Sequence, residues 1–404
     1  MCEKSANNTE NLDGMTDPHP PRKKSTVKRF ISGILMGSFF FAIVYFGVPT
    51  MYMTCFGLQI KCVDEVLKIG YNLKKIQEIP FFHALNWYLL MVANYFLFGE
   101  TFIQHGRVYL RKYYLLDMLS SYHRFISFCF YFIGLVWFVV ILRKKILRQQ
   151  FSLLFWTHFL LIVITAQACM IMQAMYEGII WLIMSIWLVS INDSCAFIFG
   201  KHFGKTPLIR VSPKKTLEGF ILGGICTIIL GAFLSHFLCH FKYLVCPIKF
   251  ASVDNEITYR SNCTPSYNFQ PIAYAIGDFS VNYYPFMKHS FYLSIFASVI
   301  APFGGFCASG FKRAVGVKDF ADTVPGHGGI LDRGDCQYLM MTFVNVYIMT
   351  FVKDPNVEEI FRKIAKLSDE QQLEFYSLLR SSLSDLLAGD VGNTSKLTLY
   401  GSYF

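Results

Sequence analysis

The chain has 404 residues, of which 54% are hydrophobic and 17% aromatic, and only 16% are charged. Soluble domains carry about 25% charged residues, so this composition excludes an ordinary soluble protein and indicates one that is embedded in a lipid bilayer. A formal net charge of +10 raises the question of nucleic acid. However, no basic run is interleaved with aromatic residues outside the apolar segments. Membrane lipids and phosphates are therefore the expected partners, and no nucleic acid is expected.

The amino-terminal segment, residues 1–29, is polar and ends in the basic run PPRKKSTVKR. It lacks the apolar core of a cleaved signal peptide, so we interpret it as a disordered cytosolic arm before an uncleaved anchor. Basic residues before the first span favour a cytosolic amino terminus. The early topology stays open, because the basic runs at 109–114 and 143–150 lie on opposite sides of one predicted span.

Apolar stretches follow one another through most of the chain. A helix needs about 20 mostly apolar residues to cross a bilayer, and seven stretches meet or nearly meet this length: 30–60, 81–99, 125–142, 151–176, 178–200, 219–241 and 290–311. An eighth, 337–352, is short and is tilted, re-entrant or a true span. No stretch alternates as in a barrel, so the predicted fold class is all-α, a polytopic membrane protein with about seven to nine transmembrane helices.

Two further segments complete the organisation. A polar loop, 242–288, contains Cys246, Cys263 and the sequon NCT at 262–264. The two thiols either pair in an oxidising lumen or remain free, and glycosylation of Asn262 likewise depends on the side of the membrane. We assign 30–352 to a transmembrane catalytic domain and 353–404 to a tail that is helical, then disordered. Ser368 and Gln371 resemble a capping box there.

The first charged loop, 192–220, begins inside an apolar stretch with Asp193. A carboxylate in a span is costly, so a metal or a basic partner is expected nearby; the alternative is an interfacial residue that pairs with Lys201. The spacing of its glycines excludes a Walker motif. Its basic residues suit either a polyphosphate or a positive-inside anchor at lipid headgroups; they are Lys201, Lys205, Arg210, Lys214 and Lys215.

The second charged loop, 309–337, mixes four basic residues, four aspartates and a histidine between residues 312 and 335. Asp332 and Asp335 are three apart, so on a helix they would share one face and one cation. Oxygen ligands without paired cysteines or histidines point to magnesium. The glycines around His327 allow a close approach to a phosphate; His327 donates a hydrogen bond there or, alternatively, transfers a proton. A surface network of salt bridges is the alternative for the whole set.

Two crossings separate these loops, so they are expected on the same face of the membrane, where they build one site. The second charged loop also resembles a known sequence signature. The segment SGFKRAVGVKDFADTVPGHGGILDRGD, 309–335, is similar to that of CDP-diacylglycerol synthases, also called phosphatidate cytidylyltransferases. Its fixed positions are met by Ser309, Lys312, Arg313, Lys318, Asp319, His327, Gly328, Gly329, Asp332, Arg333 and Asp335. The resemblance extends from about residue 28 to about residue 385.

This resemblance implies a reaction in which CTP and phosphatidic acid give CDP-diacylglycerol and pyrophosphate, with Mg2+, at the endoplasmic reticulum membrane. The product feeds phospholipid synthesis, and the active site faces the cytosol. Asp319, with Asp193 and Asp332 or Asp335, is then expected to hold the metal. The residues expected at the triphosphate are Lys312, Arg313, Lys318 and Arg333; those expected at the lipid phosphate or pyrophosphate are Lys205, Lys214 and Lys215.

Several alternatives remain at this stage. A transporter or scramblase of phosphorylated lipids would also need such a site, although no internal repeat is visible in the sequence. Another CTP-dependent lipid kinase is a second alternative. A homodimer is an open possibility.

Overall fold

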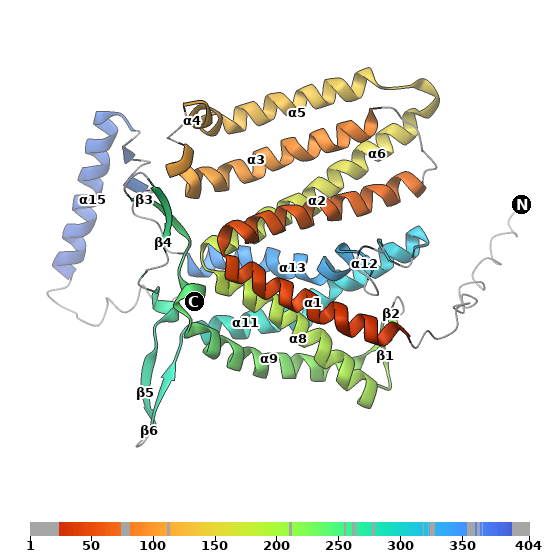
Figure 1. Ribbon diagram of the computed structural model, residues 1–404. Coiled ribbons are helices and arrows are strands. Elements are labelled where there is room, and N and C mark those ends of the chain that lie inside the picture. Colours follow the sequence, from red (N-terminus) through yellow and green to blue (C-terminus); the bar gives the residue numbers. More distant parts are fainter. Residues whose placement is uncertain are drawn as a thin grey trace, which may run out of the picture.

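A computed structural model of the chain describes residues 24–73, 81–110, 114–209, 212–253, 256–260, 263, 265–276, 279–317, 319–321, 323, 328–353, 360–361, 364–365 and 367–389. These residues are mostly helical, and the long helices lie side by side in a bundle (Figure 1). The all-α class is confirmed. The helices are α1 Lys24–Phe46, α2 Val48–Leu73, α3 Phe82–Leu110, α4 Tyr114–Ser121, α5 His123–Val140, η1 Lys144–Ile146, α6 Leu147–Leu160, η2 Leu161–Thr165, α7 Ala166–Tyr176, α8 Ile179–Phe203, α9 Leu217–Cys239, α10 Lys242–Val245, η3 Tyr267–Phe269, α11 Phe286–Val299, α12 Ala301–Val315, α13 Leu331–Tyr347, η4 Ile348–Val352 and α15 Asp369–Gly389.

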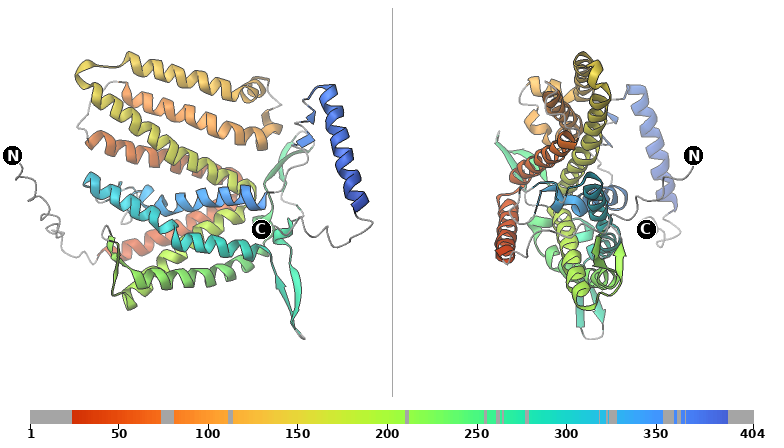
Figure 2. Two further views of the ribbon diagram at one scale, coloured as in Figure 1. Left: turned by 180° about the vertical axis from the view of Figure 1, so that it is seen from behind. Right: turned by 90° about the vertical axis from the view of Figure 1, so that its right-hand side faces the viewer.

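Five helical stretches among the described residues are long and apolar enough to cross a membrane: 123–140, 144–176, 179–203, 217–239 and 286–315. Each coincides with a predicted span. Helices α1, α2, α3 and α13 run alongside them in the bundle (Figure 2). The structure is therefore that of a polytopic membrane protein, as the composition predicts.

The first predicted span, 30–60, is corrected by the structure. It is not one helix, because the chain breaks at Gly47 between α1 and α2. Gly47 has a φ of 87°, a backbone angle that glycine adopts without a steric penalty. Pro49 follows in the first turn of α2, where a missing N–H costs nothing. The stretch thus forms two antiparallel helices, and α2 continues into the polar residues up to Leu73.

Close contact between α8 and α9 shapes the end of the bundle where the site lies. A Cβ atom added at Gly219 would lie 2.8 Å from the Cα of Gly200, and one at Gly223 would lie 2.9 Å from the Cα of Ala196. Small residues at such crossings let two backbones approach within the bilayer. Thr227 of α9 also donates a hydrogen bond of 3.3 Å to the buried Asn192 of α8. These contacts fix the part of α8 that carries Asp193.

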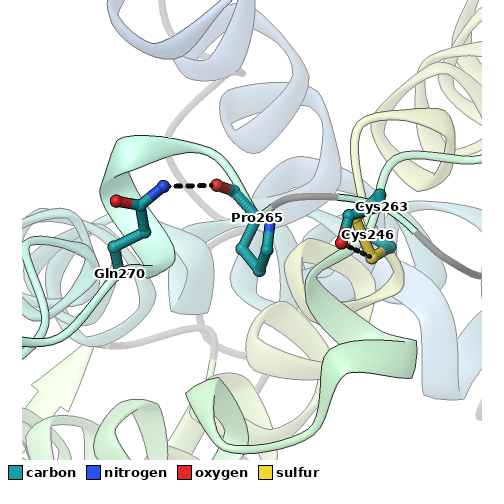
Figure 3. The surroundings of a disulfide bond; sticks show 4 residues. All are labelled: Cys246, Cys263, Pro265 and Gln270. Carbon is teal, nitrogen blue, oxygen red and sulfur yellow. Dashed lines mark hydrogen bonds between the residues drawn. A yellow bond between two sulfur atoms is a disulfide. The ribbon is translucent and has the colours of Figure 1, made fainter.

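Among the residues that the structure describes, three short antiparallel hairpins interrupt the helices, and the sequence reasoning missed them: β1 Pro207–Ile209 with β2 Ser212–Thr216, β3 Lys249–Val253 with β4 Glu256–Arg260, and β5 Ile272–Ile276 with β6 Phe279–Tyr283. Two of them lie in the loop 242–288. A disulfide joins Cys246 to Cys263 there, with Cα atoms 5.9 Å apart (Figure 3). Gln270 donates a hydrogen bond of 2.9 Å to the carbonyl of Pro265 in the same loop. The paired alternative for these cysteines is therefore confirmed.

The two ends of the bundle differ in character. Hairpin β1–β2 and the carboxyl end of α12 lie at one end, which we call the charged end, whereas β3 to β6 and α15 lie at the other (Figures 1 and 2). Both charged loops are thus on one side, as predicted. In the tail, Ser368 and Gln371 exchange hydrogen bonds of 3.2 and 3.4 Å at the start of α15. This confirms the capping box.

Candidate active site at the charged end

The second charged loop connects the last turn of α12 to the first turn of α13. Lys312 and Arg313 lie in the last turn of α12, where cations interact favourably with the helix dipole. Gly316 ends the helix in the left-handed conformation, with a φ of 74°. Asp332 lies in the first turn of α13. The predicted helical spacing of Asp332 and Asp335 is confirmed, since both belong to α13.

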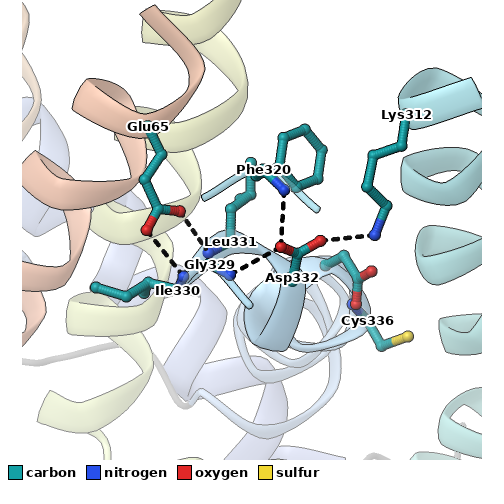
Figure 4. A network of polar contacts seen from close by, with 9 residues as sticks. Glu65, Lys312, Phe320, Gly329, Ile330, Leu331, Asp332 and Cys336 are labelled. Atoms are coloured by element: carbon teal, nitrogen blue, oxygen red, sulfur yellow. Dashed lines mark hydrogen bonds and ion pairs between the residues drawn. The ribbon is translucent and has the colours of Figure 1, made fainter. Parts of the chain in front are cut away.

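Asp332 holds the loop together (Figure 4). Its Oδ1 forms an ion pair of 2.6 Å with the Nζ of Lys312, and the two side chains are only 3% and 13% exposed. Its Oδ2 accepts hydrogen bonds of 2.9 Å from the backbone N–H groups of Phe320 and Gly329. Both oxygens are therefore engaged by the protein itself. In this arrangement Asp332 positions the loop, whereas the sequence led us to expect a metal ligand.

Glu65 of α2 is a site residue that the sequence analysis missed. It is 4% exposed, and its Oε1 accepts hydrogen bonds from Thr323 Oγ1 at 2.6 Å and from the N–H of Ile330 at 3.0 Å. Its Oε2 accepts one from the N–H of Leu331 at 3.2 Å. The first N–H groups of a helix have no partner within it, so this carboxylate caps α13 from another helix (Figure 4).

A signal for Glu65 was present in the sequence. It lies on the same helical face as Cys62, Val66 and Ile69, all of which are buried. An acidic residue on an otherwise apolar face is costly unless it has a partner. That pattern predicts a buried carboxylate with donors from elsewhere in the fold, although it does not say which donors.

Gly328 and Gly329 let the backbone pass between the acidic side chains. Gly328 has a φ of 84°, and a Cβ atom there would lie 3.1 Å from Asp332 Oδ2 and 3.3 Å from Asp319 Cγ. A Cβ atom at Gly329 would lie 2.7 Å from Glu65 Oε2. Asp319 is thus placed beside Asp332, with an exposed side chain. The glycines are required by this packing, whether or not a phosphate also approaches them.

Asp193 and Asp335 form a second acidic pair, between α8 and α13. They are close enough for their negative charges to repel one another, whereas the positive charge of Lys312 attracts the carboxylate of Asp335. Asp335 accepts a hydrogen bond of 2.7 Å from the N–H of Cys336. The basic partner of Asp193 is Lys215 of β2, with Nζ 3.3 Å from Oδ1 and both side chains nearly half exposed. The sequence suggests Lys201 as an alternative partner of Asp193, but the ion pair is formed by Lys215 instead.

The two acidic pairs do not combine into a metal-binding cluster: within the described ranges, no group of three or more histidine, cysteine or acidic side chains could hold a metal ion. Lys312 forms an ion pair with Asp332 of the first pair and acts electrostatically on Asp335 of the second. The donor set of Asp193, Asp319 and Asp335 nevertheless consists of carboxylate oxygens, which is the chemistry that magnesium prefers. The chemistry of these three side chains therefore suits magnesium, whereas Asp332 stabilises the loop through its hydrogen bonds.

The first charged loop is organised by Glu218, in the first turn of α9. Its carboxylate accepts hydrogen bonds from the N–H groups of Lys205 and Thr206, at 3.1 and 3.2 Å, and from Thr206 Oγ1 at 2.8 Å. Thr216 caps α9 by accepting the N–H of Gly219 at 3.3 Å. The backbone of the turn is therefore fixed. The side chains of Lys201 and Lys205 remain exposed at this end.

A cavity of about 320 Å³ lies between the first charged loop, α8, α9 and α12. Its polar wall includes Asp193, Lys201 and Lys215, and its apolar wall includes Phe197, Phe220 and Phe306. This size and this mixture of surfaces are typical of small-molecule sites. A ligand with an anionic head and an apolar body would match both walls.

Comparison with known proteins agrees with this geometry. Residues 27–351 match the model of a family described as the cytidylyltransferase family. The chain belongs to the cytidylyltransferase family. It is 44% identical over 372 residues to phosphatidate cytidylyltransferase 2 of Homo sapiens, covering 90% of this chain and 83% of that protein. It is 42% identical over 384 residues to phosphatidate cytidylyltransferase of Caenorhabditis elegans, covering 92% and 82%.

The structure places most of the predicted site residues at the charged end of the bundle. Ser309 is partly buried on α12, while Arg313 on α12 and Arg333 on α13 are exposed. Lys318, His327 and the side chain of Lys214 lie outside the described residues. Membership confirms the resemblance found in the sequence. The roles assigned to individual residues stay predictions.

Proposed function

We propose that this chain is a phosphatidate cytidylyltransferase, which converts CTP and phosphatidic acid to CDP-diacylglycerol and pyrophosphate. One observation carries the proposal: a cavity with lysines and an apolar wall adjoins a charged loop at the same end of a membrane bundle. The relatives bear the name of this activity. A lipid phosphate would enter from the bilayer, and a dissolved triphosphate from water.

The reaction is an in-line transfer. A phosphate oxygen of phosphatidate attacks the α-phosphorus of CTP, a new P–O bond forms, and the bond from the α-phosphorus to the bridging oxygen breaks as pyrophosphate leaves. The nucleophile is already anionic near neutral pH, so no strong general base is required. Negative charge is spread over the phosphate oxygens, and fixed cations must stabilise it.

The chain supplies these cations on its two charged loops. Lys201, Lys205 and Lys215 would bind the lipid phosphate or the leaving pyrophosphate. Arg313 and Arg333 would bind the triphosphate, together with Lys318. Lys312 is committed to Asp332 in this arrangement, so its role is to hold the loop in the geometry that the other residues need.

Magnesium is the cofactor that this site would take. When bound, it would neutralise charge on triphosphate oxygens. Asp193 and Asp335 would hold it as a pair. Asp319 would join them when the loop adjusts to the bound ion, since the three carboxylates do not form one cluster in this structure. Glu65 and Asp332 keep the loop in place from behind.

We further propose that the charged end faces the cytosol, where CTP is available, and that the membrane is that of the endoplasmic reticulum. The Cys246–Cys263 disulfide supports this orientation, because it lies at the opposite end of the bundle and disulfides persist in the oxidising lumen. A homodimer is a further part of this proposal.

One assay tests the activity. Purified protein in phospholipid vesicles is given CTP labelled in the cytidine, phosphatidate and magnesium, and the lipid fraction is analysed for labelled CDP-diacylglycerol. We expect this product, and we expect it to vanish when magnesium is chelated. Movement of phosphatidate between leaflets without labelled product would favour a transporter. A phosphorylated lipid alcohol, made with γ-labelled CTP, would favour a CTP-dependent lipid kinase.

A further inference from the structure

A second cavity, of about 340 Å³, lies between α2, α6 and α12. It shares no lining residue with the cavity that contains Asp193. Apolar and aromatic side chains make up most of its wall, and none of the described residues that line it is charged: Gly70, Ser152, Leu153, Phe155, Trp156, Phe159 and Phe311. Its volume is within the range of ligand pockets, and its surface suits a hydrocarbon chain.

Trp156 forms a rigid part of this wall. Its ring stacks on Phe159, with centroids 5.7 Å apart, and on Phe311, with centroids 5.4 Å apart. A Cβ atom at Gly70 would lie 2.8 Å from its Nε1, so glycine is what lets the indole lie against α2. Three aromatic rings from α6 and α12 are thus held in a fixed stack beside the cavity.

An exposed arginine, Arg148, lies on α6 one turn before Ser152, which lines this cavity. Arg148, Ser152 and Trp156 are spaced four residues apart on α6, so they share one face of the helix. Arg148 is exposed and forms no ion pair with any residue that the structure describes. Helix α6 begins at the charged end of the bundle (Figure 1). An arginine at the membrane surface with an apolar cavity one to two turns deeper matches the two parts of an anionic lipid.

We propose that this cavity binds an acyl chain of a resident anionic glycerophospholipid, whose phosphate pairs with Arg148. The lipid is distinct from the reacting phosphatidate, because the first cavity has its own lysines and its own apolar wall. That distinction depends on the proposed function. The binding itself does not.

Fluorescence quenching tests the binding. The protein is placed in phosphatidylcholine nanodiscs to which a lipid with brominated acyl chains is added, either phosphatidylglycerol or phosphatidylcholine. The fluorescence of Trp156 is obtained by subtracting the signal of the Trp156→Phe variant. We expect half-maximal quenching at a several-fold lower mole fraction of the brominated anionic lipid. Equal quenching by the two lipids would overturn the proposal.

Three variants sharpen this test. Arg148→Gln should abolish the preference for the anionic lipid, whereas Lys242→Gln, an exposed cation at the opposite end, should keep it. Ser152→Phe, which fills the cavity, should reduce quenching of Trp156 by both lipids. A preference that survives Arg148→Gln would refute the assignment of the phosphate.

The kinetic arm separates this lipid from the substrate. Arg148→Gln should leave the KM for phosphatidate unchanged. A several-fold rise in that KM would assign the cavity to the reacting lipid and overturn the proposal. Since the fluorescence arm needs no turnover, a protein that binds anionic lipid but makes no CDP-diacylglycerol would refute the proposed function alone.

Discussion

Glu65→Gln tests whether the carboxylate of α2 organises the active-site loop. The substitution keeps the size of the side chain and one oxygen, which can still accept from Thr323 and Ile330. It replaces Oε2 by an NH2 group that faces the N–H of Leu331, so the third hydrogen bond is lost. Hydrogen bonds to charged groups contribute about 1.5–3 kcal/mol each.

The expected loss follows from that figure. If about 2–3 kcal/mol of loop stabilisation disappears, kcat/KM for CTP should fall by about 30- to 150-fold, because 1.36 kcal/mol corresponds to a factor of ten. The initial rate of CDP-diacylglycerol formation from labelled CTP measures this. Hydrogen exchange should show faster exchange of the Ile330 and Leu331 amides, with the amides of α8 and α9 unchanged.

Asp64→Asn is the matched control. Asp64 is the neighbour of Glu65, but it pairs with the exposed Lys68 four residues later. Exposed pairs of this kind contribute about 0.3–0.5 kcal/mol, so the rate should change by about twofold or less. Wild-type rates and unchanged amide exchange in Glu65→Gln would refute the organising role.

Three further predictions follow from the site and the fold. Asp319→Asn should abolish turnover while expression and detergent-extracted yield stay normal; wild-type rates would remove Asp319 from the metal site. Gly329→Ala should lower activity at least tenfold, because the added Cβ atom would meet Glu65 Oε2 at 2.7 Å, whereas Gly57→Ala, with open space around it, should be neutral in the same rate assay. Cys263→Ser should lower the free energy of unfolding by about 3 kcal/mol, since the disulfide closes a loop of 17 residues; an unchanged thermal midpoint would contradict this.

The sequence alone determined the helical membrane class, most of the spans and the positions of the charged residues. These properties are local: apolar length and charge spacing are read directly along the chain. The motif between Ser309 and Asp335 was also sufficient to indicate the family. The hairpins were missed because the strands are only three to five residues long, so each offers too few positions for a pattern to stand out.

Only the tertiary structure decided how the charged groups are paired. Glu65 and Ile330 are 265 residues apart, and no local pattern relates them. Asp332 looked equivalent to Asp335, yet packing of α12 against the loop gives it Lys312 and two N–H donors, which leaves neither oxygen unengaged. Such partners depend on how helices cross, and a crossing is set by side-chain packing between distant segments. Charge at the membrane surface can therefore be located from sequence, whereas the division between residues that hold the loop and residues that face the substrate requires the fold.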